Sequence, residues 1–161
     1  MKHLLHRRSP IRRALAVCLV GLVAPAAFAA DGSGAVNDTA LTVEFAGGPY
    51  VIPVPLTLLL PDPLCVEDTP LCYTYDLTVA LSDELRLAPG NEFASLDIAL
   101  KFEGDQNDLD MYVYDAAGNL VTSAAGGAGV QEAVSVPLDF APNGVYRIQV
   151  VPWLVVGPVS F

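Results

Sequence analysis

Basic residues are scarce in this chain, and histidine is absent beyond its first few positions. Only eight of the 161 residues are Lys or Arg, against 18 Asp or Glu, and both histidines, His3 and His6, stand at the N-terminus. An acidic surface repels nucleic acid and anionic membranes, so neither is an expected partner. Without imidazole, the remaining chain cannot build a Ser-His-Asp or Cys-His catalytic centre.

Catalytic sequence motifs are missing as well. The chain contains no GxSxG nucleophile elbow and no phosphate-binding loop. A carboxylate pair such as Asp108 and Asp110 is the one remaining option, which would make the protein a small hydrolase of the glycosidase kind. Eighteen acids provide many such pairs by chance, so we predict that the protein is not an enzyme and has no catalytic residues.

The N-terminal segment 1–30 has the three parts of a secretory signal peptide. A basic start is followed by the apolar run "ALAVCLVGLVAPAAFAA", and Ala27-Phe28-Ala29 fits the small residues of a cleavage site. The run is short for a membrane span and is interrupted by Pro25. We therefore expect cleavage, a secreted or periplasmic location, and no membrane attachment afterwards.

Cysteine is nearly absent from the exported part, where only Cys65 and Cys72 remain, flanking "VEDTPL". Thiols oxidise outside the cytoplasm, so the spacing predicts a disulfide that closes this short loop. Two cysteines without histidine cannot complete a structural zinc site. We expect no certain cofactor, and calcium is the one metal that the acids allow.

Helical periodicity is also lacking after the signal, and alternation of apolar and polar residues takes its place. The alternating segments lie at 41–45, 75–81, 96–102, 109–113, 132–138 and 146–150, and "LVTSA" and "PVSF" add two short strands. Turn signals separate them every 8–12 residues. This pattern predicts an all-β fold, an antiparallel β-sandwich of the jelly-roll or immunoglobulin-like kind with seven or eight strands.

Three segments follow from this pattern. Residues 1–30 are the signal peptide, and the small polar residues 31–40 are expected to be a flexible leader. The sandwich is expected to fill 41–161. Within it, "SDELRLAPGN" predicts a polar connection with about one helical turn, and the five prolines between Pro49 and Pro63 exclude a central strand there.

The stretch "NDLDMYVYDAAGN" holds the candidate site residues. It predicts a hairpin arm, with Gly118 turning the chain and the aspartates on the solvated face. A calcium site is the alternative, with Asp105, Asn107, Asp108 and Asp110 as ligands, because calcium takes six to eight oxygens. Tyr112 and Tyr114 share the face of Asp110 and form a weaker candidate contact for sugar or protein.

The segments "NDLDMYVYDAAGNLVTSA", "EAVSVPL" and "NGVYRIQVVP" resemble the bacterial pre-peptidase C-terminal domain. The resemblance spans about 41–161 and is strongest at 108–151. It implies a non-catalytic β-sandwich that accompanies secreted enzymes and contacts an extracellular protein or polysaccharide. It also implies an alternative, a calcium-stabilised carbohydrate- or matrix-binding module. Here the domain follows its signal directly, without the usual catalytic neighbour.

Overall fold

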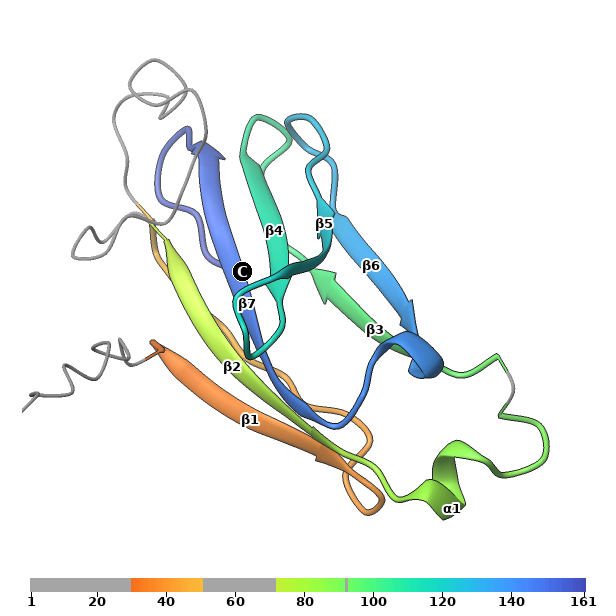
Figure 1. Ribbon diagram of the computed structural model, residues 1–161. Helices are drawn as coiled ribbons and strands as arrows, with labels where there is room; N and C mark the ends of the chain where they lie inside the picture. Colours follow the sequence, from red (N-terminus) through yellow and green to blue (C-terminus); the bar gives the residue numbers. More distant parts are fainter. Residues whose placement is uncertain (1–29, 51–71, 92) are drawn as a thin grey trace, which may run out of the picture.

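The computed structural model describes residues 30–50, 72–91 and 93–161, and the regular secondary structure in these is almost entirely β (Figure 1). The predicted disulfide joins Cys65, outside the described residues, to Cys72 directly before a strand, and it stays a prediction, as does the signal peptide. The elements are β1 (Gly32–Asn37), β2 (Tyr73–Ala80), α1 (Asp83–Arg86), β3 (Ser95–Leu100), β4 (Asp108–Tyr114), β5 (Leu120–Ala124), β6 (Glu132–Pro137), the 3₁₀ turn η2 (Leu138–Phe140) and β7 (Gly144–Leu154).

The strands form two sheets that pack face to face. The larger sheet has the order β1-β2-β7-β4-β5, and the smaller one pairs β3 with β6. Every pairing is antiparallel except β1 with β2, which is parallel. The architecture confirms the predicted all-β sandwich.

Period-two alternation places the core where the sequence predicts it. The buried side chains of the large sheet include those of Leu77, Val79, Met111 and Ile148, and those of the small sheet include Leu96, Ile98, Leu100 and Val136. All belong to one cluster. A single apolar core therefore joins the two sheets, as expected when one face of each strand is apolar.

The expected flexible leader is a strand instead, so that prediction is wrong for residues 32–37. β1 pairs along its length with β2, which satisfies its backbone hydrogen bonds. Its glycines have a packing reason, because a Cβ at Gly34 would overlap the hydroxyl of Tyr75. Small residues here indicate close contact with an aromatic side chain and not flexibility.

Two expected strands do not form ladders. Residues 41–49 lack a strand, although Phe45 still packs on the core and stacks on Tyr75 with ring centroids 4.0 Å apart. "PVSF" forms no strand, although it contributes an isolated bridge between Val159 and Tyr50 and two backbone hydrogen bonds between Phe161 and Gly47. Alternation reports which side chains are buried, but a ladder also requires a neighbouring backbone at the correct distance.

Two local predictions are confirmed. α1 is a single helical turn in the predicted connection, where the Ser82 hydroxyl accepts a hydrogen bond from the Leu85 N–H at 3.1 Å. The β4–β5 hairpin turns at Gly118, which has φ of 83°. Asp115 closes this turn by accepting hydrogen bonds from Ala117 N and Asn119 N, both at 2.9 Å. In the described residues, no helix is long and apolar enough to cross a membrane.

We predict that Leu109→Ala lowers the free energy of unfolding by about 2–4 kcal/mol, because the side chain is fully buried and its loss leaves a cavity. Urea denaturation followed by fluorescence measures this. The matched control is Leu120→Ala, at a position that is 54% exposed and should change stability by less than about 0.5 kcal/mol. Equal effects of the two variants would contradict the position of the core.

Candidate functional site

The acidic residues of β4 are buried, which corrects the expectation that they form a solvated face. Asp108 is 8% exposed and Asp110 is 5% exposed. Asp110 lies opposite Val151, which is itself fully buried on β7. An irregularity in the β4–β7 register separates Asp108 from Leu109. This end of the large sheet is thus covered on both faces, and alternation alone cannot reveal that.

Glu132, at the start of β6, is a third buried acid and was missed by the sequence analysis. It is 4% exposed, and its Oε1 accepts a hydrogen bond from Gly126 N at 2.7 Å. It has the same parity as Val134 and Val136, so the alternation of β6 already pointed this carboxyl group inward. The sandwich therefore buries three carboxyl groups at the end where β4 and β6 begin.

The three acids repel one another. Burial raises the pKa of Asp108, and the charge of Glu132 raises it further. The pKa of Asp110 is raised to about 6, first by burial and then by the charges of Asp108 and Glu132. A hydrogen bond from the Tyr112 hydroxyl lowers this pKa, but the bond is long, at 3.5 Å. Asp108 Oδ1 is buried and has no hydrogen-bond partner. Such an orphaned oxygen costs on the order of 1–3 kcal/mol.

The structure does not bring the four predicted calcium ligands together. The Asn107 side chain is occupied, since its Oδ1 accepts from Val156 N at 2.8 Å and its Nδ2 donates to Glu103 O at 2.7 Å. Asp105 is exposed in the loop. Across the described ranges, no three acidic, histidine or cysteine side chains are placed to hold a metal ion. Of the predicted set, Asp108 and Asp110 alone remain as oxygen donors.

The predicted tyrosine strip is not an open platform. Tyr112 and Tyr114 are half-buried, and Asp110, which precedes them on the same face of β4, is buried. Burial raises the pKa of the Tyr114 hydroxyl. Flat exposed rings are what sugar stacking requires, so these tyrosines fit packing better than binding.

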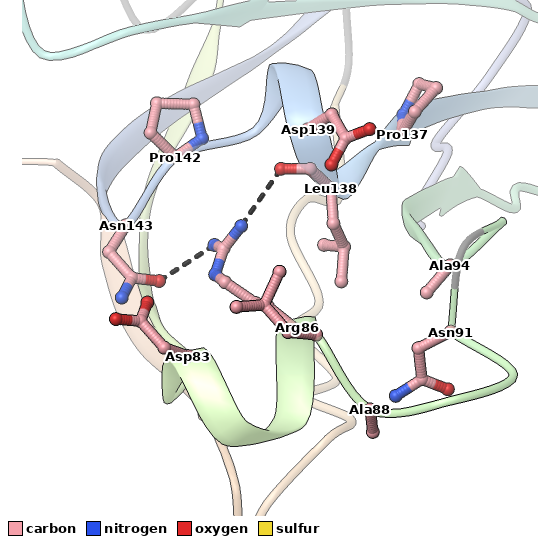
Figure 2. A pocket seen from close by; sticks show the side chains of 11 residues that line it. Asp83, Arg86, Ala88, Asn91, Ala94, Pro137, Leu138, Asp139, Pro142 and Asn143 are labelled. Atoms are coloured by element: carbon pink, nitrogen blue, oxygen red, sulfur yellow. Dashed lines mark hydrogen bonds between the residues drawn. The ribbon is translucent and has the colours of Figure 1, made fainter.

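A second candidate site lies at the opposite loop connections, around Arg86 of α1. Its guanidinium donates to Leu138 O and Ala141 O, both at 2.9 Å, and to Asn143 Oδ1 at 2.8 Å. Figure 2 shows Arg86 between Asn143 and Leu138, at the centre of a hollow of about 560 Å³. These bonds tie α1 to the β6–β7 connection, so the two loops form one unit.

Three large apolar side chains of these loops are strongly exposed. Phe93 is 95%, Leu87 is 81% and Phe140 is 75% exposed. Leu87 lines the hollow, and Phe93 adjoins Ala94, whose carbonyl accepts from Leu138 N at 2.9 Å beside Phe140. We call Leu87, Phe93 and Phe140 the apolar rim. Its sequence signal was a large apolar residue inside segments that otherwise read as polar turns.

Neither a scan against protein-family models nor a search of curated proteins found a match to this chain. The two sheets define the protein as an all-β sandwich. The resemblance to the pre-peptidase C-terminal domain remains a prediction from sequence motifs.

Asp110→Asn should stabilise the protein at pH 7.5 by about 1–3 kcal/mol and flatten its pH dependence. The pKa of Asp110 is raised to about 6, so the fold favours its neutral form. The stabilisation of the fold by the neutral Asp110 carboxyl group is complete below about pH 4, the pKa of the group in the unfolded state. It is lost as the pH rises through 6. Urea denaturation between pH 4 and 8, in EDTA, measures it.

The control for this titration is Asp105→Asn, which removes an exposed acid from the adjoining loop. It should leave the shape of the pH profile unchanged. A variant at Asp110 that is no more stable than the wild type at pH 7.5 would contradict the electrostatic strain at this end of the sandwich.

Proposed function

We propose that the protein is an exported, non-catalytic accessory module that binds another extracellular protein through the apolar rim. One observation carries this proposal: Leu87, Phe93 and Phe140 are each at least 75% exposed at one end of the sandwich. Exposed apolar groups gathered on a soluble domain and bordered by polar residues are typical of protein-binding surfaces. The signal peptide and the family resemblance, both predictions from sequence, agree with an extracellular partner.

The arrangement of the rim suits it to binding. Arg86 makes three hydrogen bonds to the β6–β7 connection, so little conformational freedom remains to be lost when a partner binds. Asp83 and Asp139 line the same hollow and supply polar groups around the apolar side chains (Figure 2). An apolar centre with a polar border is the usual layout of a protein–protein contact.

The acids considered for catalysis support a non-catalytic role. Asp108 and Asp110 are buried in the strand, and neither lines the hollow around Arg86. A general acid must reach a bound substrate within hydrogen-bonding distance. We therefore place the function in binding, with the small hydrolase as the least supported alternative.

Photo-crosslinking in the organism that makes the protein tests this function. A benzophenone amino acid replaces Phe93 or Phe140, and both positions should give the same crosslinked species in the exported fraction. The species should fall at least fivefold when Leu87→Ser is added, because the rim loses a large part of its apolar contact.

Leu120 is the matched control position, since it is an exposed apolar residue at the start of β5 and does not line the hollow around Arg86. The probe there should not give the same species. Equal crosslinking at Leu120, or none at Phe93 and Phe140, would show that the rim is not the contact surface.

A calcium-stabilised carbohydrate- or matrix-binding module is the second candidate. The observation that favours it is the orphaned Asp108 Oδ1 beside two further buried acids, Asp110 and Glu132, because a cation would neutralise their repulsion. Against it, calcium takes six to eight oxygens, and no group of three acids in the described residues is placed to hold a metal. We therefore rank it below the protein-binding function.

Calorimetry of the protein in EDTA and then in millimolar calcium decides this alternative. Binding to the folded state raises the melting temperature by mass action. The protein-binding function predicts no shift. An upward shift that is lost in Asp108→Asn, but kept in Asp105→Asn, would establish the calcium site.

A further inference from the structure

The smaller sheet leaves an open groove beside β3. The segment 41–46 lies on the core face of the large sheet, as the stacking of Phe45 on Tyr75 shows, and this is the face that β3 and β6 also cover. Between this segment and β3 lies a groove of about 510 Å³, with Leu77 and Ile148 of the large sheet among its lining residues. We call it the edge groove. Its volume is in the range of ligand sites.

One wall of the edge groove is an unpaired strand edge. In the described part of the chain, β3 has β6 as its single neighbour. The hydrogen bonds that flank the ladder show its phase, because Leu138 N donates to Ala94 O, and Phe102 N donates to the Gln131 side chain. The backbone N–H and C=O groups of the even-numbered β3 residues thus face β6. Ser95, Asp97 and Ala99 direct their backbone N–H and C=O groups to the groove.

The opposite wall also lacks a ladder. Backbone bonds of the 41–50 region occur at its ends, where Ala40 pairs with Asn37 and Gly47 with Phe161. For residues 41–46 the described structure contains no backbone hydrogen bond. Among the described residues, the groove is therefore bordered on both sides by backbone groups that lack a backbone partner, with apolar side chains below. This is the environment of a strand position in a sheet.

The charge around the groove is acidic. Asp97 lines it, and Glu44 is exposed on the opposite wall. Eighteen acidic residues against eight basic ones make two copies of this chain repel each other. An occupant from a different protein, with basic residues, is favoured over a second copy.

We infer that the edge groove binds an extended peptide segment of another protein, which adds to β3 as a new strand. The segment places alternate apolar side chains on Leu77 and Ile148 and pairs its backbone with Ser95, Asp97 and Ala99. Lys or Arg on either side of the apolar residues lies near Asp97 and Glu44. Main-chain pairing supplies affinity in this mode, and alternate side chains supply specificity. The groove shares Asn91, Ala94 and Leu138 with the hollow around Arg86, but none of the three apolar rim residues lines it, so this proposal does not depend on the proposed function.

Amide hydrogen exchange with a synthetic peptide tests the inference. The probe is acetyl-Lys-Val-Thr-Val-Thr-Val-Lys-amide, and the purified protein is measured with and without it. Exchange at Ser95, Asp97 and Ala99 should slow at least tenfold at saturation. Leu96 and Ile98 already bond to β6 and should be protected in both states.

Two altered peptides serve as controls. Proline in place of the central valine removes a ladder donor, and glutamate in place of both lysines reverses the charge. Both should leave the exchange of the three amides unchanged. No slowing with the first peptide, or equal slowing with the proline peptide, would overturn strand addition. Equal slowing with the glutamate peptide would overturn the basic partner.

A pair of proline variants provides a second readout. Ala99→Pro removes a donor that faces the groove, while Ala133→Pro removes its cross-strand counterpart on β6, which faces the other way. Peptide binding by titration calorimetry should weaken at least tenfold in the first variant and stay unchanged in the second. If Ala99→Pro fails to fold, the exchange experiment decides alone. Equal binding by both variants would overturn the site. A dimer in sedimentation, together with protection of the same three amides in hydrogen exchange without peptide, would identify a second copy of the chain as the occupant. This result would overturn the inference that the occupant is another protein.

Discussion

The pairing of β7 on both of its edges is the interaction on which the rest of the structure depends. This strand of 11 residues bonds to β2 on one side and to β4 on the other. Its residues Tyr146, Ile148 and Val150 face the small sheet and are buried. Because β2 and β4 lie far from β7 in sequence, the large sheet forms only when distant segments meet. The core, the acidic end and the loop end all take their positions from that meeting.

The two ends of the sandwich differ in how they treat polar groups. Where β4 and β6 begin, three carboxyl groups are buried without a basic partner among the described residues, and Asp108 retains an oxygen without a hydrogen bond. At the loop end, Arg86 donates three hydrogen bonds to neutral acceptors. The first arrangement stores electrostatic strain that depends on pH, and the second holds loops in place. Electrostatic strain of the first kind makes the stability of the fold depend on pH, whereas a rigid surface of the second kind is suited to binding.

The apolar rim and the edge groove expose different chemistry. The rim presents side chains, whereas the groove presents backbone groups over an apolar floor. Side-chain surfaces select partners by shape, and open strand edges select extended segments. Natural sandwiches usually protect such edges against unwanted pairing, and the acids Asp97 and Glu44 fulfil that role here while admitting a basic segment.

The sequence by itself determined the all-β class, the faces of β2, β3, β4 and β7, the α1 turn and the Gly118 hairpin. Each of these depends on local alternation or turn chemistry. Only the tertiary structure decided that 32–37 is a parallel strand, that Asp108 and Asp110 are buried, and that Asn107 is occupied by Val156 N. It also placed Leu87 on the hollow around Arg86 and left Phe93 and Phe140 exposed. These outcomes depend on contacts between distant segments, that is, on which strands pair, in which register, and what covers each face. The periodicity of residues along one strand carries no information about such contacts.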